Sequence, residues 1–458
     1  MKGAKAMEDI SRRGFISKSA KSMLTVAGGV AVAVLPGKAR AVSANEKVIM
    51  AVIGTGGRGR DVSRQFVNRR DVEMAYVCDA DEERIGSYPR QLERIQGRAP
   101  RAVQDMRRVL DDKDVDAVLI ATCDHWHGLA TIWACQAGKD VYVEKPPCHN
   151  IWEGMRMVEA ARKYNRVVQC GLQNRSAEFA HSAREYIQSG KLGDIPLVKV
   201  YNMKGGGAFT CPPDSERPKS VDYDLYLGPA PSRPFNRGHF HDGWKMWWAY
   251  GGGDMGDDGI HQLDLARFVL GDKPVPKVVT ASGGRLAFQD DREVPDTQVV
   301  SFEYDRQLMT FELTEYAPYM IKESDEVRNG DKFPFWPTNA TRIELYGTRG
   351  LMYLGRHGGG WQVITADGKE TDKFYGRQAN DEHRANFLDC VRTRNRPAAD
   401  IEIGVTSNLL VHYGNMGVRA GGCRMVIDPQ TLAVSGDDGA NKFFKRDYRE
   451  AYAVPEQV

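Results

Sequence analysis

A glycine-rich motif near the start of the chain suits the binding of a phosphate: Gly54-Thr55-Gly56-Gly57-Arg58-Gly59. They contain the pattern G-x-G-x-x-G, in which the first glycine permits a tight turn, the second lets the backbone approach a pyrophosphate, and the third lets a helix pack on a strand. A β-branched run, Lys47 to Ile53, precedes the pattern, and a helical pattern follows it through Phe66. In this context the residues Gly54, Gly56, Gly57, Arg58 and Gly59 predict a dinucleotide-binding turn.

An acidic residue stands where a ribose would be bound. The apolar run Val72 to Cys78 predicts a second strand, and Asp79 follows it, 20 residues after Gly59. A carboxylate at this point binds a ribose diol and repels a 2'-phosphate, and the next residue is Ala80 rather than arginine. We therefore expect NAD rather than NADP, although Arg58 and Arg60 could each reach an adenosine phosphate and leave NADP open.

The elements that must position these residues alternate between strand and helix. Further strands are expected at 115–121, 140–144 and 167–170, with helices over about 127–137 and 150–164. Such alternation specifies a parallel sheet with helices on both faces, and ligands bind beyond the carboxyl ends of its strands. Site residues should therefore follow strands.

Two strand ends and one glycine run carry a family resemblance. Residues 121–127, Ala-Thr-Cys-Asp-His-Trp-His, resemble the A-T-P-x-x-x-H loop of the glucose-fructose oxidoreductase, inositol dehydrogenase and rhizopine catabolism (Gfo/Idh/MocA) family, with Cys123 in place of the proline. Residues 144–146 resemble its E-K-P motif, and residues 251–264 its G-G-G-x-x-x-D-x-G-x-H-x-x-D motif. With the glycine turn, these motifs stand in family order from residue 54 to residue 264.

The resemblance implies two domains after a signal segment. We expect a signal peptide over 1–44, an α/β Rossmann NAD(P)-binding domain over 45–170, and an α+β substrate-binding and oligomerisation domain with a large open, mainly antiparallel sheet over 171–458. The β-rich runs at 197–201, 278–282, 297–304, 308–315 and 342–346 agree with such a sheet. In the family its outer face often forms contacts between subunits, so a homodimer or homotetramer is expected.

The family roles place a catalytic group at Lys145, Asp257 and His261. Removing a hydride from a carbinol carbon requires a base for the hydroxyl proton and stabilisation of the oxyanion. His261 is expected to be the base because imidazole titrates near working pH. Asp257 is four residues earlier, on the same face if the segment is helical, and Lys145 could hydrogen-bond the same oxygen.

The remaining expected contacts divide between cofactor and substrate. Thr122, Trp126, His127, Glu144 and Lys145 are expected near the nicotinamide ribose, with Trp126 as a wall. No metal is expected, because His125 and His127 have no identifiable further ligands. Aromatic and polar groups suit a sugar or polyol, and core packing remains open for the aromatic ones; the residues expected at the substrate are Gln173, Arg175, Trp244, Trp248, Tyr250, Asp257 and His261.

The N-terminal segment has the composition of an export signal. Ser11-Arg12-Arg13-Gly14-Phe15-Ile16-Ser17-Lys18 resembles the twin-arginine signal, an apolar stretch follows from Met23 to Leu35, and small residues precede cleavage after Ala41 or Ala44. We therefore expect the twin-arginine translocase to carry the folded protein to the periplasm. Because no free NAD pool is expected there, the cofactor should be tightly bound and reset in place.

Three functions remain open at this level. The first is hydride transfer between the bound nicotinamide and a sugar, glycoside or cyclitol hydroxyl carbon. The second is redox-neutral glycoside cleavage through transient oxidation of the sugar ring, and the third is non-catalytic sugar binding.

Composition excludes several other classes. Of 458 residues, 41% are hydrophobic and 27% charged, with a formal net charge of +2. That content does not suit a disordered chain, and the small net charge argues against a nucleic-acid partner. The eight cysteines are too scattered for a disulfide scaffold.

Overall fold

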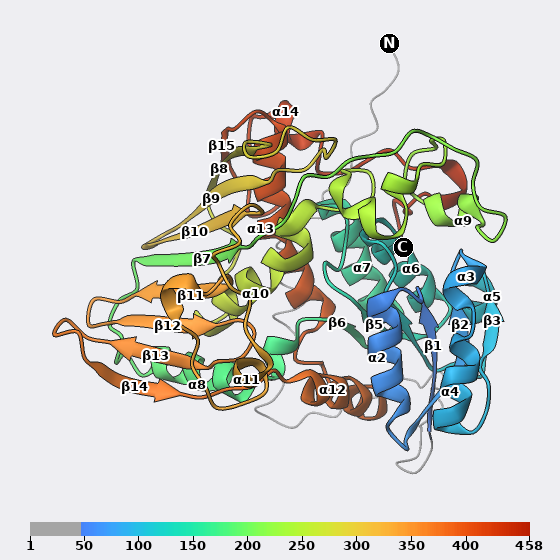
Figure 1. Cartoon of the computed structure of the whole chain (residues 1–458), viewed down its shortest axis with the longest axis horizontal. Coiled ribbons are helices and arrows are strands. Elements are labelled where there is room, and N and C mark those ends of the chain that lie inside the picture. Colours follow the sequence, from blue (N-terminus) through green and yellow to red (C-terminus); the bar gives the residue numbers. More distant parts are fainter. Residues whose placement is uncertain (1–46) are drawn as a thin grey trace, which may run out of the picture.

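The computed structural model describes residues 47–458, so the predicted signal peptide lies outside the described residues. Two β-sheets lie side by side, each covered by helices (Figure 1). Within 47–458, none of the helices has both the length and the apolar content needed to cross a membrane.

The first sheet has six strands in the order β3-β2-β1-β4-β5-β6, and all neighbours pair in parallel. This arrangement confirms the predicted Rossmann sheet, and the carboxyl ends of its strands share one edge. The strands are β1 (Val48–Ile53), β2 (Val72–Cys78), β3 (Arg101–Val103), β4 (Ala117–Ile120), β5 (Asp140–Val143) and β6 (Val168–Cys170).

Helices cover both faces of the first sheet. On one face, α2 (Gly57–Val67) and α4 (Tyr88–Gln96) contribute Phe66 and Leu92 to a core that also holds Phe387 of α12 (Asn380–Thr393). On the other face lie α6 (Asp124–Gln136) and α7 (Ile151–Lys163). The predicted cap of α7 is present, because the Asn150 side chain accepts a hydrogen bond from the Glu153 amide at 2.9 Å.

The second sheet has nine strands in the order β14-β13-β12-β11-β7-β10-β9-β8-β15. Only β7 and β10 pair in parallel, so the sheet is mixed and mostly antiparallel, as the sequence predicts. Its strands are β7 (Leu197–Met203), β8 (Val278–Gly284), β9 (Thr297–Tyr304), β10 (Gln307–Thr314), β11 (Arg342–Tyr346), β12 (Leu351–Gly355), β13 (Trp361–Ile364), β14 (Glu370–Phe374) and β15 (Arg424–Val426).

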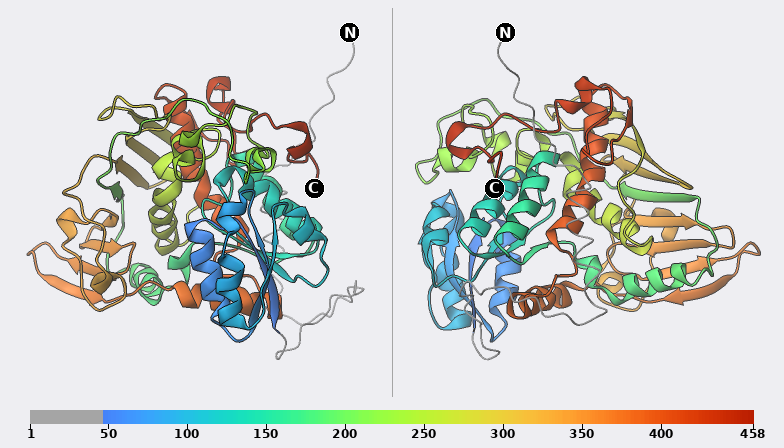
Figure 2. Two further views of the ribbon diagram at one scale, coloured as in Figure 1. Left: turned by 45° about the vertical axis from the view of Figure 1, so that its right-hand side comes forward. Right: turned by 180° about the vertical axis from the view of Figure 1, so that it is seen from behind.

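Three helices pack on the inner face of the second sheet: α8 (Glu178–Gln188), α10 (Ile260–Val269) and α13 (Ile401–Arg419). Their apolar side chains join alternate residues of the strands, among them Phe302 of β9 and Phe311 of β10, in the largest core of the molecule. The 180° view in Figure 2 shows α13 running between the two sheets.

Three segments return from the second sheet to the first. Helix α12 packs against it, and so does the C-terminal segment, where Tyr452, Val454 and Val458 are buried beside α6. Residues 204–254, here called the strap, leave β7 and lie over the α6 end of the first sheet before the short π-helix η4 (Met255–Gly259) (Figure 1). The domain boundaries expected from the sequence remain a prediction.

The remaining elements are short. They are α3 (Glu82–Ile85), α5 (Arg107–Asp111), η1 (Gln173–Ser176), α9 (Tyr223–Leu227), η2 (Arg237–His239), η3 (His241–Met246), α11 (Asp325–Arg328), η5 (Trp336–Thr338), α14 (Asp438–Asn441) and η6 (Glu450–Tyr452).

Candidate active site

A cavity of about 340 Å³ opens at the carboxyl ends of the first sheet's strands. The glycine turn and the loops after β2, β4 and β5 line it. Residues of the strap and of the C-terminal segment also contribute to its lining. The predicted site residues that line it are Gly54, Gly56, Gly57, Arg58, Asp79, Thr122, Trp126, His127, Glu144, Lys145, Trp244 and Asp257.

The glycine turn fits a dinucleotide phosphate on steric grounds. Gly54 has a φ of 92°, and a Cβ placed on Gly59 would stand 1.9 Å from the Gly54 carbonyl oxygen, so the turn and α2 can pack only without side chains. In contrast, a Cβ on Gly57 would meet nothing within 4 Å. The backbone at Gly57 therefore faces open space at the start of a helix, where free N–H groups bind phosphates.

Asp79 closes the turn and faces the cavity. Its carboxylate accepts hydrogen bonds from the Thr55 amide at 2.7 Å and from the Asp81 amide at 3.1 Å. Burial raises the pKa of Asp79, and these amides partly offset that effect. A carboxylate can accept about four hydrogen bonds, which leaves capacity for a ribose hydroxyl.

The three arginines near the turn have different roles. Arg60 is held by the backbone, because its guanidinium donates to the carbonyl oxygens of Thr55 and Arg84. Arg58 donates to Glu144 Oε1 at 2.9 Å, across the glycine turn from the loop after β5. Arg84 lines the cavity near Gly56. The residue that could reach an adenosine phosphate is therefore Arg84, which the sequence did not single out, rather than Arg60.

Lys145 is held by a carboxylate from the second domain. Its Nζ lies at the end of β5 and donates to Asp257 Oδ1 at 2.7 Å and to the Asp257 carbonyl oxygen. Lys245 of the strap donates to the other carboxylate oxygen of Asp257 at 2.5 Å. Burial alone would raise the pKa of Asp257, but the two ammonium groups outweigh it and hold that pKa well below its usual range. Asp257 is therefore ionised and fixes both lysines.

Asp124 adds a buried carboxyl group beside this pair. It begins α6, is buried, and lines the same cavity. Burial raises the pKa of Asp124 well above its ordinary value, although Lys145 acts in the opposite direction. A protonated carboxyl group can donate a hydrogen bond into the cavity.

The loop after β4 is held by its own side chains. His127 places one ring nitrogen 2.7 Å from the Pro146 carbonyl oxygen and the other 3.1 Å from that of Thr122, which ties the loops after β4 and β5 together. Trp126 Nε1 donates to the Leu225 carbonyl oxygen at 2.9 Å, which attaches the strap to α6. Both residues line the cavity, so Trp126 serves as a wall and also as an anchor of the strap.

The structure changes the expectation for His261. Residues 255–259 form a π-helix, so the four-residue spacing does not place Asp257 and His261 as neighbours on one α-helical face. Burial lowers the pKa of His261 well below its usual range, and the charges of Arg356 and Lys145 lower it further. The imidazole is therefore neutral at pH 7, and the expectation that it titrates near working pH is wrong for the ligand-free protein.

The residues expected at the substrate do not all come together. Trp244 lines the cavity, and Gln173 lies near Arg58 through its amide. Arg175 is buried and forms ion pairs with Asp264 and Asp272, so its charge is already used inside the second domain.

Two aromatic residues also take structural positions. Tyr250, itself part of the strap, is fully buried in an aromatic cluster, and its ring centre lies 5.2 Å from that of His125. The guanidinium carbon of Arg419 lies 4.9 Å from the centre of the Trp248 ring. The core-packing alternative that the sequence left open holds for Tyr250.

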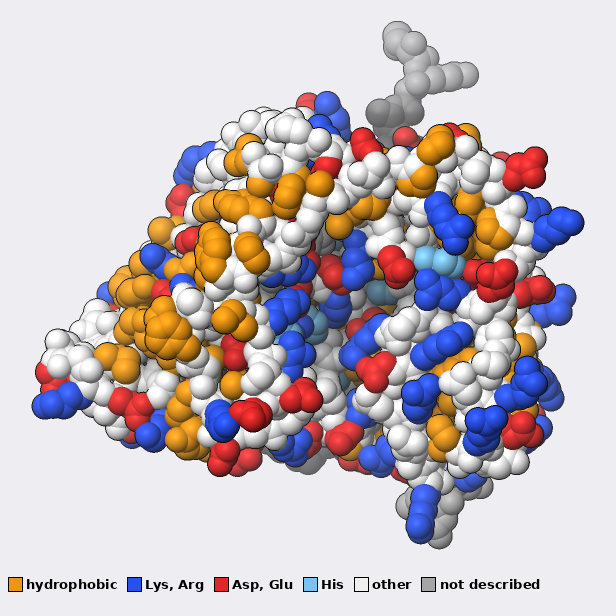
Figure 3. All heavy atoms as spheres, viewed as in Figure 1, with side chains coloured by type: hydrophobic (Ala, Val, Ile, Leu, Met, Phe, Trp, Pro, Cys, Tyr) orange, Lys and Arg blue, Asp and Glu red, His pale blue; other side chains and the backbone are white. Residues whose placement is uncertain are grey.

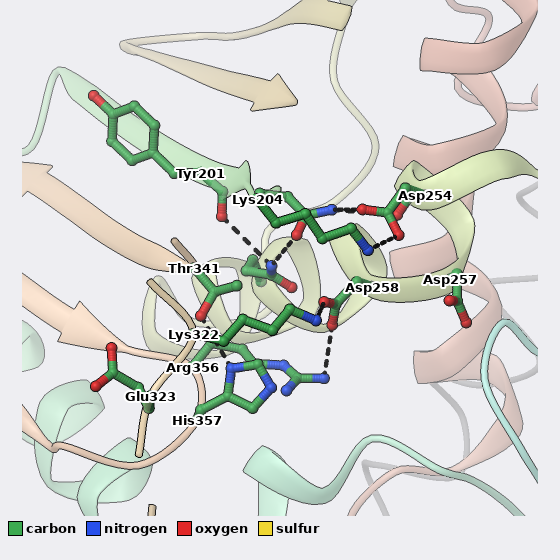
Figure 4. Close-up of polar contacts among 12 residues, drawn as sticks. Tyr201, Lys204, Asp254, Asp257, Asp258, Lys322, Glu323, Thr341, Arg356 and His357 are labelled. Atoms are coloured by element: carbon green, nitrogen blue, oxygen red, sulfur yellow. Dashed lines mark hydrogen bonds and ion pairs between the residues drawn. The ribbon is translucent and has the colours of Figure 1, made fainter. Parts of the chain in front are cut away.

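A second polar group lies beside strands of the second sheet, and its residues are not among those that line this cavity. Asp258 accepts from Lys322 Nζ at 2.5 Å and pairs with Arg356 Nη2 at 3.0 Å, and Lys204 pairs with Asp254 (Figure 4). No periodicity or motif in the sequence marks Lys322, which lies within the loop between β10 and β11, or Arg356, which directly follows β12. Lys245 stands between Trp244 and Met246 in the aromatic run, a position that could have drawn attention.

No group of three or more His, Cys, Asp or Glu side chains within 47–458 is arranged to hold a metal ion, and all eight cysteines are free. The residues present do fit a dinucleotide. The open glycine turn, the acceptor at Asp79 and the cations near Lys145 follow one another along the same cavity.

Comparisons with known proteins agree with the fold. A family model described as the oxidoreductase family, NAD-binding Rossmann fold, matches residues 48–172, and one described as the C-terminal alpha/beta domain of that family matches residues 203–307. The WlbA dehydrogenase of Bordetella pertussis, solved with NADH and UDP-GlcNAcA, superposes with a TM-score of 0.60 at 20% identity, covering 84% of this chain and 99% of that one.

Two curated relatives are similar in sequence. The 1,5-anhydro-D-fructose reductase of Ensifer adhaerens is 26% identical over 251 residues, which is 54% of this chain and 60% of the relative. The D-glucoside 3-dehydrogenase of Escherichia coli strain K12 is 26% identical over 246 residues, which is 52% and 59% respectively. The aligned part is thus less than two thirds of each relative.

Proposed function

Because the chain belongs to the Gfo/Idh/MocA family of oxidoreductases, we propose that it transfers a hydride between a hydroxyl-bearing carbon of a sugar, glycoside or cyclitol and a bound nicotinamide cofactor. The observation that supports this most directly is the Lys145–Asp257 pair in the cavity that begins at the glycine turn. The similar proteins are a reductase and a dehydrogenase of carbohydrates by name, which favours a carbohydrate.

The chain's own residues supply the proton chemistry. The nicotinamide, when bound, supplies the acceptor or donor of hydride. Lys145, held by Asp257, donates a hydrogen bond to the substrate hydroxyl and stabilises the developing alkoxide. His261 is neutral and can accept the proton as general base. Asp257 acts as a positioning residue, because its depressed pKa makes it a poor base.

NAD is the cofactor that these residues favour. Asp79 is half-buried just after β2 with acceptor capacity left for a ribose diol, and a 2'-phosphate beside it would meet an acid. Calorimetric titration of apoprotein with NAD and NADP tests this proposal. Tighter binding of NADP would contradict it and would point to Arg84.

The strap supports tight cofactor binding. Asp222 and Glu82 form backbone hydrogen bonds with Ala80 and Ser220, His241 Nε2 donates to Asp81 at 2.8 Å, and Tyr452 reaches Asp224 at 2.7 Å. These contacts bring chain from the second domain and the C-terminus over the cavity. A dinucleotide held there leaves only after the strap moves.

The cellular location of the protein is a proposal that the N-terminal motif supports. We propose export to the periplasm by the twin-arginine translocase with the cofactor already bound. The outer side of the second sheet, where Tyr319, Ile321 and Phe335 are exposed, is proposed to contact another copy in a dimer or tetramer. Light scattering of the purified protein measures the latter.

One experiment tests the function as a whole. Mass spectrometry of the denatured protein identifies the bound cofactor, and a sugar panel is then followed by the absorbance of the reduced cofactor. Reduction by at least one sugar is expected. Release of aglycone from a nitrophenyl glycoside without net reduction would favour the redox-neutral reaction instead, and a protein purified without nicotinamide would favour mere sugar binding.

A further inference from the structure

We propose that the substrate is an acidic sugar, whose carboxylate lies against Lys322 on the wall formed by the second sheet. The proposal deepens the function above and rests on it. It identifies a specificity-determining residue that lies outside every motif used so far, in the loop 315–341 between β10 and β11.

The first step is the charge balance around η4. Asp257 and Asp258 are consecutive, yet they pair with different cations: Asp257 pairs with Lys145 and Lys245. Asp258 pairs with Lys322 and Arg356 (Figure 4). Each carboxylate thus carries two cations. The third acid of the segment, Asp254, has one cation, Lys204. Asp257 and Asp258 are therefore each outnumbered by the cations that they hold.

The second step distinguishes the cations that the phosphates of a cofactor would neutralise from the cations that remain for a substrate. Lys145 and Lys245 line the nucleotide cavity, where a cofactor's phosphates add negative charge. Lys322 and Arg356 lie on the other wall and do not line that cavity. Their surplus of one positive charge over Asp258 therefore remains when the nucleotide is bound.

The third step is that the neighbouring groups do not cancel the surplus. His357 and His261 are both neutral, because burial and the nearby Arg356 lower the pKa of each well below its usual range. Glu323 follows Lys322 but is directed to Asn339, and burial raises its pKa to about 7 while Arg328 acts in the opposite direction. In Figure 4 its carboxyl group lies apart from Asp258 and Lys322.

Lys322 is the cation that a ligand can reach. Its side chain is 39% exposed, against 11% for Arg356, and Nζ makes one hydrogen bond to protein, with Asp258. An ammonium group has three donors, so two remain for a ligand. Figure 3 shows the hollow between the two lobes, with both Lys or Arg and Asp or Glu side chains along it.

A carboxylate there would also act on the base. Arg356 and Lys145 both depress the pKa of His261, so a negative charge beside Lys322 would weaken that effect and bring the imidazole closer to the pH at which it accepts a proton. With a neutral sugar, Lys322 and Arg356 would share the single charge of Asp258, and His261 would stay a weak base. The acid is thus favoured in binding and in proton transfer.

Direct binding to the holoprotein tests the proposal without requiring turnover. The probes are methyl β-D-glucuronide and methyl β-D-glucoside, and the corresponding galacturonide and galactoside, measured by calorimetry at low salt. In at least one pair the acid should bind about tenfold more tightly than its neutral partner, the effect of one charge-assisted hydrogen bond. Lys322→Gln should bring that ratio near one, and Lys322→Arg should retain it.

A matched control and two outcomes decide the result. Lys332→Gln removes another lysine of the same loop, one that is exposed and paired with Glu326, and should leave the ratio unchanged. Equal binding within both pairs, or no binding of either acid, would overturn the proposal. Tighter binding of glucose 6-phosphate than of the uronides would contradict the proposal that the recognised anion is a carboxylate. If the acids bind preferentially but no sugar reduces the cofactor, the hydride-transfer proposal alone fails.

Discussion

Lys145 Nζ lies 2.7 Å from Asp257 Oδ1, although 112 residues separate the two in the chain. The lysine follows strand β5 of the first sheet, and the aspartate belongs to η4 beside the second sheet. This ion pair therefore joins the two domains at the point where a substrate hydroxyl would meet the cofactor. Removing either partner should affect catalysis and domain docking differently.

Lys145→Met should abolish most hydride transfer while the protein keeps its cofactor. The methionine preserves the apolar stem but removes the donor to the alkoxide, and losses of about 100-fold to 10,000-fold in kcat are typical for such a group. Single-turnover reduction of the bound cofactor measures the change. Lys369→Met, at an exposed position paired with Asp367, serves as control, and undiminished turnover in the Lys145 variant would refute the assignment.

Asp257→Asn should destabilise the fold in a pH-dependent way. The substitution leaves Lys145 and Lys245 without their carboxylate, and we expect the free energy of unfolding to fall by about 2 kcal/mol. This loss is below the usual range for a buried pair because the site is partly open to solvent. The pKa of Asp257 is depressed on folding, so its contribution is fully present above the unfolded value of about 3.9 and declines as the pH falls.

Denaturant titrations of both proteins at pH 7 and pH 3.5 measure this difference. The gap in the free energy of unfolding between wild type and variant should narrow at the lower pH. A gap that stays constant would show that Asp257 is not held as an anion by the two lysines.

Two glycines of the turn should separate fold from cofactor binding. Gly59→Ala places a methyl group 1.9 Å from the Gly54 carbonyl oxygen, so α2 must shift and stability should fall by about 1–3 kcal/mol. The methyl group of Gly57→Ala meets no protein atom within 4 Å. The melting temperature of the cofactor-free variant should therefore equal that of the cofactor-free wild type, while the cofactor content drops. Calorimetric melting and cofactor mass spectrometry report the two effects, and equal stability losses would contradict the assignment.

The sequence predicted the parts of the site that strands position. Gly54, Asp79 and Lys145 follow β1, β2 and β5, and strand periodicity together with the motifs located them. Lys322 and Arg356 were missed because loop conformation depends on tertiary contacts, which leave no periodic pattern. The π-helix also leaves no periodic pattern. A spacing of four residues places Asp257 and His261 on one face only if the segment is α-helical, and the structure does not have that geometry there.

His241→Ala should release the cofactor faster. His241 Nε2 donates to Asp81 at 2.8 Å and fixes the strap beside the ribose end of the cavity. Without it the strap should open more often, and the off-rate should rise by about tenfold, the equivalent of one hydrogen bond to a charged group. A chase with an excess of a nicotinamide analogue measures the off-rate. The control is His181→Ala, at an exposed position of α8. Equal off-rates for His241→Ala and wild type would show that this contact of the strap does not retain the cofactor.

Replacing Arg12 and Arg13 by lysine should leave the protein in the cytoplasm with its cofactor bound. The paired arginines, not their charge, are the proposed signal, and lysine preserves the charge. Fractionation followed by immunoblotting locates the protein, and mass spectrometry measures its NAD. Because the twin-arginine route carries folded proteins, Gly57→Ala, which is expected to fold without retaining cofactor, adds a second arm in the native signal background. Export of the lysine variant would refute the proposed route, whereas export of a cofactor-free Gly57 variant would show that folding alone, without NAD, satisfies the translocase.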